Sequence, residues 1–337
     1  MNSWYAHHRM DNLPLVKIGE DATQKAVMHN APRKNLTIVV LGETSRADNF
    51  SLGGYSRDTN PLMRQDGVIY FPHTTSCARQ PQFPCRACSP ICRAPHYDEE
   101  LAHHQEGVLD ILQRAGIQVL WNDNDGGCKG ACDRVPHQNV TDLKLTGQCI
   151  DGECYDDVLF HNLDSYIDNL KQDGIIVLHT IGSHGPTYYN RYPAAFRKFT
   201  PTCDTNEIQG CTREQLTNTY DNTILYVDYV VDKAIKLLQS KQDKFTTSLV
   251  YLSTTANRWE KMASICMVCR IPSRRIRRNM CRWRCGSPPT TSSATAFPRT
   301  VCSSGRKKRI TRRIICSPPC SACSASAPAS TRRQMIS

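Results

Sequence analysis

Four short apolar runs have the length and composition of buried β-strands. They are rich in Val, Ile and Leu, and they cover residues 36–42, 117–123, 174–182 and 245–253. Amphipathic stretches separate these runs and predict helices at residues 96–116, 156–171 and 212–242. Strands that alternate with helices predict an α/β fold with a largely parallel sheet and right-handed crossover connections.

The segment before the first strand is polar and aperiodic. Residues 1–35 contain Pro14 and Pro32 and predict a linker. No run of 18 or more apolar residues occurs, so no membrane span is expected in this chain. The 337 residues suffice for one large α/β domain or two smaller ones.

The 18 cysteines include three close pairs, Cys128/Cys132, Cys149/Cys154 and Cys203/Cys211. Their spacings suit small disulfide loops in an oxidising compartment. None of the three pairs has the C-x-x-C spacing that a cytosolic zinc site more often uses.

The net charge of +11 is the sum of two segments whose charges have opposite signs. Residues 254–337 carry 18 Lys and Arg against one acid, Glu260, whereas residues 1–253 carry 24 basic and 30 acidic side chains. The helical and strand periodicity also stops near residue 254. A basic tail of this kind is compatible with nucleic-acid or membrane-surface binding.

Polar side chains follow two of the predicted strands directly. Glu43 comes after the strand at 36–42, and His184 lies in the SHGP sequence after the strand at 174–182. Open α/β sheets place ligand chemistry at the carboxyl ends of their strands. A carboxylate at this position often serves as a metal ligand, and the alternative for Glu43 is a solvated acid on a loop. A structural loop histidine is the alternative for His184.

Several long motifs resemble one enzyme family. VVLGETSRADNFSLGGYSRDTNP, HTTSC, WNDNDGGCKGACD and LHTIGSHGPTYYNRYP are similar to sequences of the lipid A phosphoethanolamine transferases, which include the mobile colistin-resistance enzymes. The resemblance covers roughly residues 1–77 and 93–253. It implies the alkaline phosphatase-like α/β/α sandwich of the sulfatase superfamily, with a mostly parallel central sheet. It also implies that the preceding membrane domain and the C-terminal part of the catalytic domain are missing from this chain.

The resemblance implies a reaction and a place for it. Phosphoethanolamine passes from phosphatidylethanolamine to lipid A through a phospho-Thr intermediate, with zinc as the cofactor. The enzyme works as a monomer at the membrane surface on the periplasmic side of the inner membrane of a Gram-negative bacterium. The added cation confers polymyxin resistance, since it lowers the anionic charge that these peptides bind. Glu43 is then a metal ligand, His184 a catalytic and substrate-binding residue, and Lys129 a contact for the head-group phosphate. A solvated loop lysine is the alternative for Lys129.

The chain departs from the family pattern where catalysis depends on it. Pro81 stands at the position of the nucleophilic threonine and has no hydroxyl. Thr254 and Thr255 stand where the family has an Asp-His pair of metal ligands. Met267 replaces a further site histidine. We therefore expect this chain to be inactive.

One cause accounts for these departures. The family sequence between SC and PRAHYDEE resembles GTATAVSVPCMFSNM; deletion of one base from a back-translation of it spells ARQPQFPCRACSPI, as found from residue 78. The same operation on SDHGESLGENGIYLHGLPY spells residues 253–271. Residues 78–92, which lie within the catalytic domain at 36–253, and residues 254–337, which follow it, are accordingly interpreted as out-of-frame translations.

This interpretation changes the remaining signals. The basic tail at 254–337, rich in Cys, Arg, Ser and Pro, is expected to be disordered. Nucleic-acid binding is no longer predicted for it. The three close cysteine pairs remain the expected disulfides. Two other functions stay open: a sulfatase- or phosphodiesterase-type hydrolase of the same superfamily, and a non-enzymatic basic, Cys-rich binding protein.

Overall fold

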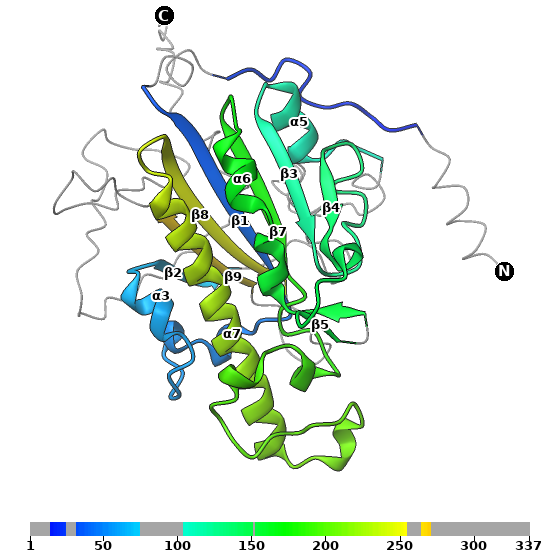
Figure 1. The fold of residues 1–337 in the computed structure, drawn as a ribbon, viewed down its shortest axis with the longest axis vertical. Helices are drawn as coiled ribbons and strands as arrows, with labels where there is room; N and C mark the ends of the chain where they lie inside the picture. Colours follow the sequence, from blue (N-terminus) through cyan, green and yellow to red (C-terminus); the bar gives the residue numbers. More distant parts are fainter. Residues whose placement is uncertain (1–13, 25–31, 75–103, 151, 255–263, 271–337) are drawn as a thin grey trace, which may run out of the picture.

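A mixed seven-stranded sheet forms the centre of the protein (Figure 1). The computed structural model describes residues 14–24, 32–74, 104–150, 152–254 and 264–270, and the statements below concern these residues. The strand order is β2-β9-β8-β1-β7-β3-β4. The strands are β1 (Lys34–Glu43), β2 (Ile69–Thr74), β3 (Gln118–Asp123), β4 (His137–Asn139), β7 (Gly174–His179), β8 (Phe245–Thr254) and β9 (Ser264–Arg270). A separate hairpin pairs β5 (Cys149–Ile150) with β6 (Glu153–Cys154).

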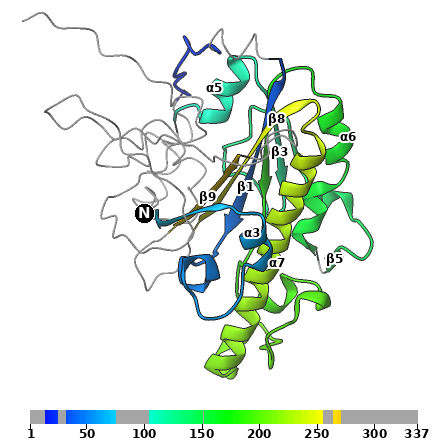
Figure 2. The ribbon, with the colours of Figure 1, turned by 90° about the vertical axis from the view of Figure 1, so that its left-hand side faces the viewer.

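Helices cover both faces of the sheet, which gives the expected α/β/α arrangement. Figure 2 shows α5 (Val108–Arg114) on one face and α3 (Pro61–Gln65), α6 (Leu163–Asp168) and α7 (Arg213–Ser240) on the other. Short 3₁₀-helices occupy several connections: Ala47–Asn49, Ser51–Gly53, Val140–Leu143, Asp156–Phe160, Tyr188–Asn190, Ala194–Phe196 and Ile208–Gly210.

Strand β1 is the central strand and supplies both halves of the core. It pairs in parallel with β7 on one side and with β8 on the other. Its side chains alternate between the faces, so Leu36, Ile38 and Val40 join the core cluster beneath α7. Val39 and Leu41 join the cluster beneath α5. A strand that is buried on both faces reads as a continuous apolar run, which is why the sequence revealed it.

The strand predictions are confirmed, and the helix predictions are confirmed in part. The expected helix at 212–242 is α7, but the one at 156–171 is divided into a 3₁₀-helix and α6. Asn162 lies between them with a left-handed φ of 56°, which interrupts the helical backbone. The helix expected at 96–116 is described only as α5; residues 96–103 lie outside the described residues.

Strand β9 differs from the expectation of a disordered tail. Residues 264–270 pair antiparallel with both β8 and β2, although they follow the predicted frame break. Their sequence, SICMVCR, contains β-branched and apolar residues, and the outer side of β8 offers backbone groups that need partners. For these seven residues the expectation of disorder is wrong. Residues 271–337 lie outside the described residues.

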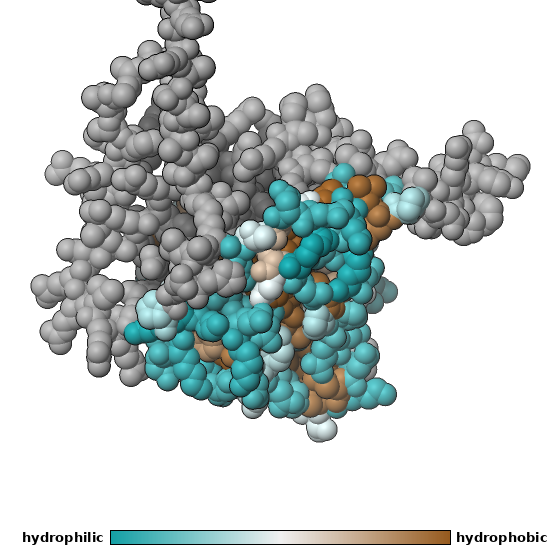
Figure 3. Space-filling model, turned by 90° about the horizontal axis from the view of Figure 1, so that it is seen from above, coloured by the Kyte–Doolittle hydropathy of each residue, from teal (hydrophilic) through white to brown (hydrophobic). Residues whose placement is uncertain are grey.

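The described surface is mainly hydrophilic. Seen from above, hydrophobic areas are small and interrupted (Figure 3). The large apolar side chains exposed in the described ranges are Leu15, Val16 and Ile150. Within those ranges no helix has the length and hydrophobicity of a membrane span.

Helix α7 begins with a capping box that can be tested directly. The Thr212 hydroxyl accepts from the Gln215 backbone N–H, and the Gln215 side chain accepts from the Thr212 N–H. We predict that Thr212→Ala lowers the free energy of unfolding by ~1 kcal/mol because one helix-end donor loses its partner. Urea denaturation followed by circular dichroism measures it.

Thr217→Ala is the matched control on the same helix. The Thr217 hydroxyl only donates to the Arg213 carbonyl, and Ala is the better helix former. This variant should be as stable as the starting chain or slightly more stable. Equal destabilisation by both variants would contradict the capping role.

Candidate functional site

Three neighbouring strands bring the predicted site residues to one edge of the sheet. Glu43 ends β1, His184 follows β7, and Lys129 follows β3. These strands are parallel and adjacent in the order β1-β7-β3, so their carboxyl ends meet. Backbone bonds join the connecting loops, with the Ser183 N–H donating to the Glu43 carbonyl at 2.9 Å. The sequence prediction of a site at the carboxyl ends of the strands therefore fits the fold.

Glu43 is 5% exposed and lies where two backbones nearly touch. A Cβ added to Gly182 would lie 2.6 Å from the Glu43 carbonyl oxygen, and Gly182 has a φ of +52°. Only glycine satisfies both conditions at this position. The Thr44 hydroxyl donates to the Glu43 carboxylate at 2.9 Å, which orients one of its oxygens.

The turn after Glu43 is fixed by a tyrosine from α7. The buried Tyr220 hydroxyl donates to the Thr44 carbonyl and accepts from the Arg46 N–H, both at 2.8 Å. The Arg46 guanidinium lies 4.9 Å from the centre of the same ring. Thr44 has a φ of +55°, a conformation that costs a β-branched residue free energy, so these contacts compensate for it.

A buried ion pair lies beside Glu43. The His179 imidazole is 2.5 Å from one Asp123 carboxylate oxygen and 3.7 Å from an Asp125 oxygen. Burial alone lowers the pKa of His179, but the hydrogen bond and charge of Asp123 outweigh it and raise the pKa above its ordinary value. Burial acts to raise the pKa of Asp123, but the hydrogen bond and charge of His179, together with hydrogen bonds from the Gly127 N–H and the Trp121 side chain, more than offset it, so this pKa is lowered.

Two further acids belong to the same cluster. Burial raises the pKa of Asp125 to about 7, and the charges of Glu43, Asp123 and Asp156 add to the shift while His179 opposes it. Burial also raises the pKa of Asp156, whose carboxylate accepts from the backbone N–H groups of loop residues after β7. Sequence reasoning did not identify these acids, although the WNDND run at the end of β3 was a signal for them.

Both residues expected to contact substrate are exposed at this edge. His184 lies in the loop after β7, and Lys129 lies in the loop closed by the Cys128–Cys132 disulfide. Lys129 has a left-handed φ of 50°. The structure contains all three expected disulfides, Cys128–Cys132, Cys149–Cys154 and Cys203–Cys211, so these predictions are confirmed.

The positions that departed from the family pattern are only partly described. The Thr254 backbone, at the end of β8, pairs in register with Glu43. Pro81 and Thr255 lie outside the described residues.

The residues at these positions do not fit a zinc site. Zinc in proteins takes four ligands from carboxylates, imidazoles and thiolates. Glu43 supplies a carboxylate, but Pro81 has no donor side chain and Thr254 and Thr255 offer only hydroxyl groups. Cys128, Cys132 and Asp133 form a compact group of metal-ligand residue types in the described part, but both sulfurs belong to a disulfide and give no thiolate.

Comparison with known proteins identifies the fold family. The sulfatase family profile matches residues 35–253. The chain belongs to the sulfatase family. Among sulfatase-family relatives, it is 73% identical over 251 residues to phosphoethanolamine transferase EptA of Salmonella typhimurium, covering 74% of this chain and 46% of that protein. It is 37% identical over 242 residues to the phosphatidylethanolamine transferase Mcr-1 of Escherichia coli, covering 69% of this chain and 44% of that protein.

Solved structures agree with this assignment. The integral membrane lipooligosaccharide phosphoethanolamine transferase A of Neisseria meningitidis superposes with a TM-score of 0.74 and 40% identity, covering 79% of this chain and 52% of that one. The soluble domain of the same protein gives a TM-score of 0.70 and 41% identity, covering 76% and 81%. The resemblance to phosphoethanolamine transferases is thus confirmed for this sulfatase-family chain, which spans less than half the length of the curated relatives above.

The raised pKa of Asp125 predicts a pH dependence of stability. Between its ordinary value of 3.8 and about 7, the folded state binds a proton that the unfolded state releases. The free energy of unfolding therefore falls as the pH rises through this window. We expect Asp125→Asn to flatten this fall between pH 5 and 7.5, as measured by urea denaturation at each pH.

The exposed acid Asp142, outside the cluster, supplies the control. Asp142→Asn removes one carboxylate from the surface without touching the cluster, so it measures the effect of losing an acid elsewhere in the chain. A profile of Asp125→Asn that runs parallel to that of the starting chain would show that Asp125 ionises normally.

Proposed function

We propose that this chain derives from the periplasmic catalytic domain of a lipid A phosphoethanolamine transferase and has lost the transfer reaction through two breaks in the reading frame. The observation that carries the proposal is the 73% identity to EptA, combined with a family match that ends at residue 253. That end coincides with the second predicted frame break, at 253–254.

The reaction needs an oxygen nucleophile, and this chain has no hydroxyl at the position where the family has its nucleophilic threonine. In the proposed ancestral cycle, a threonine oxygen attacks the phosphorus of phosphatidylethanolamine, and the bond to the diacylglycerol oxygen breaks. The leaving alkoxide takes a proton, and a phosphate oxygen of lipid A then displaces the threonine. Pro81 stands at the position of this threonine, and a proline side chain has no atom that forms a phosphoester.

The surviving residues support recognition of a phosphate group. His184 and Lys129 are exposed side chains on neighbouring loops at the carboxyl ends of β7 and β3. A Lys ammonium attracts phosphate as a point charge, and a His imidazole can donate to a phosphate oxygen or to a leaving group. We infer that binding of phosphoethanolamine outlasts the loss of transfer in this chain.

The proposed location follows from the disulfides and from the relatives. Three disulfides persist in an oxidising compartment, and the periplasm is one. We propose that the chain is located on the periplasmic side of the inner membrane, where phosphatidylethanolamine and lipid A are accessible.

The absence of transfer is tested with a labelled donor lipid. The chain as written, incubated with phosphatidylethanolamine labelled in its head group and with lipid A, should give no labelled lipid A above background. A frame-corrected chain, with the bases around codons 77–95 and 253–254 restored, is the matched control and should transfer label. Release of free phosphoethanolamine without transfer by the corrected chain would instead favour the hydrolase. Labelled lipid A from the chain as written would overturn the proposal.

Zinc content gives a second test that does not depend on turnover. We expect the purified chain to retain far less than one zinc per molecule after dialysis, because two of the three expected ligand positions, Thr254 and Thr255, lack a carboxylate or imidazole. The frame-corrected chain should retain at least one zinc under the same conditions. Atomic absorption spectroscopy measures both, and stoichiometric tight zinc in the uncorrected chain would contradict the proposed loss of the site.

A further inference from the structure

A buried arginine holds the backbone of His184. Arg191 is 3% exposed, and its Nε donates to the His184 carbonyl at 2.7 Å. A terminal nitrogen of the same guanidinium donates to the Thr187 hydroxyl at 2.8 Å. A single side chain thus ties down two points of the loop that carries the exposed imidazole.

Arg191 is itself anchored from outside the loop. Its two terminal nitrogens donate to the two Glu153 carboxylate oxygens at 2.8 and 3.0 Å, in a bidentate pair. Bidentate pairing fixes the plane of the guanidinium as well as its position. Glu153 lies on β6, in the hairpin that the Cys149–Cys154 disulfide closes. The orientation of Arg191 therefore comes from the hairpin.

The same short segment holds the other end of the loop. Asp156, two residues after Cys154, accepts from the Ile181 and Gly182 N–H groups at 2.8 and 3.0 Å. The loop after β7 is consequently held by Asp156 at its start and by Arg191 at and beyond His184. Both attachments lead back to residues 153–156.

The imidazole of His184 lacks such support of its own. Within the described part of the chain, no hydrogen bond or ion pair is formed by its ring nitrogens, and the side chain is exposed. Its direction is then determined by the backbone from which it projects. A buried guanidinium is always charged and is costly to leave unpaired, so this attachment has one strongly favoured geometry.

We propose that Arg191 is a positioning residue for His184, which it orients for contact with the phosphate of phosphoethanolamine. This inference rests on the proposed function, since that function assigns the phosphate contact to His184. Arg191 does not touch the ligand; it acts through the His184 carbonyl.

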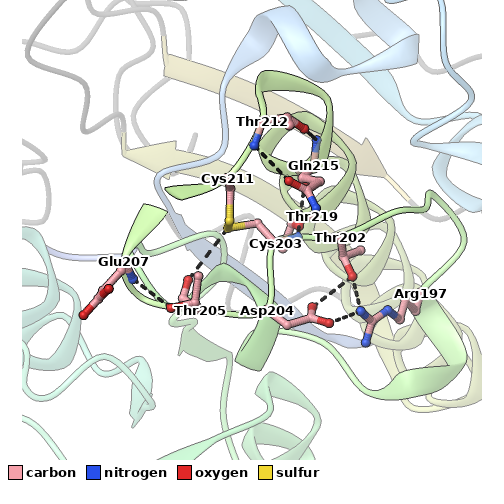
Figure 4. Close-up of a disulfide and its surroundings, with 10 residues drawn as sticks. All are labelled: Arg197, Thr202, Cys203, Asp204, Thr205, Glu207, Cys211, Thr212, Gln215 and Thr219. Carbon is pink, nitrogen blue, oxygen red and sulfur yellow. Dashed lines mark hydrogen bonds and ion pairs between the residues drawn. A yellow bond between two sulfur atoms is a disulfide. The ribbon is translucent and has the colours of Figure 1, made fainter. Parts of the chain in front are cut away.

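The test follows the His184 resonances in the chain as written, labelled with ¹⁵N and ¹³C histidine. His184→Gln assigns its imidazole among the 11 histidines. Phosphoethanolamine is titrated into the starting chain, Arg191→Gln and Arg191→Lys. Arg197→Gln is the matched control, because Arg197 is an ion-paired arginine nearby whose partners are Thr202 and Asp204 (Figure 4).

We expect the His184 imidazole signal to shift saturably in the starting chain and in Arg197→Gln. Arg191→Gln should weaken phosphoethanolamine binding about tenfold, because a misoriented His184 loses one charge-assisted hydrogen bond to the phosphate. Arg191→Lys should restore only part of the affinity, because an ammonium cannot reproduce the fork geometry. The His184 backbone amide, which donates to the Ile181 carbonyl, should exchange faster in Arg191→Gln than in Arg197→Gln.

Glu153→Gln provides a second variant should Arg191→Gln fail to fold. Glu153 is partly exposed, and a glutamine there keeps one acceptor oxygen for the buried guanidinium, so this variant weakens the Arg191 anchor without leaving Arg191 unpaired. Glu153→Gln should weaken phosphoethanolamine binding and speed exchange of the His184 amide, as Arg191→Gln does, but by a smaller factor. The positioning role would be overturned if the Arg191 and Arg197 variants gave the same His184 imidazole signal, the same His184 amide exchange rate and the same affinity for phosphoethanolamine. Absence of any shift in the starting chain would overturn the phosphate contact, and amide exchange would then still decide whether Arg191 holds the loop.

Discussion

The site depends on the close approach of two backbones, one at the end of β1 and the other in the loop after β7. The Glu43 carbonyl accepts from the Ser183 N–H, and Gly182 fits against Glu43 only because it has no side chain. This contact holds the carboxylate at the end of one strand beside the loop that follows the other. The acids after β3 join from the next strand, which pairs in parallel with β7. The relative placement of all these groups is therefore a property of the sheet, and local loop structure only refines it.

Much of this sheet was predictable from sequence, because its central strands are buried on both faces. Runs such as residues 36–42 and 174–182 are dominated by Val, Ile and Leu, which is typical of strands buried on both faces. Helix α7 was predictable for a related reason, since its apolar positions recur with helical spacing over many turns. Strand β4 has three residues and carries no comparable pattern. Strand β2 contains Pro72, which argues against a strand in sequence reasoning.

Some residues of the site were likewise predictable from sequence, and others were not. Glu43 and His184 were identifiable because each directly follows a predicted strand. Tyr220, Asp156 and Arg191 were not, because their roles come from contacts between residues far apart in the chain. Local pattern reports which face of an element is buried, but it does not report which loop a buried polar group will bind. The two proposed frame breaks fall outside these supporting contacts: Tyr220, Asp156 and Arg191 lie within the matched range 35–253, apart from residues 78–92.

The outermost strands of the sheet determine how the domain meets other molecules. Among the described strands, β9 covers the outer side of β8, so the two outermost strands of the sheet are β2 and β4. The pairing of β2 with β9 is irregular between Phe71 and Thr74, and Pro72 within it has no N–H to offer a further strand. The opposite edge is only three residues long. Both edges are thus poor templates for intermolecular strand pairing, which protects the folded domain from edge-to-edge aggregation.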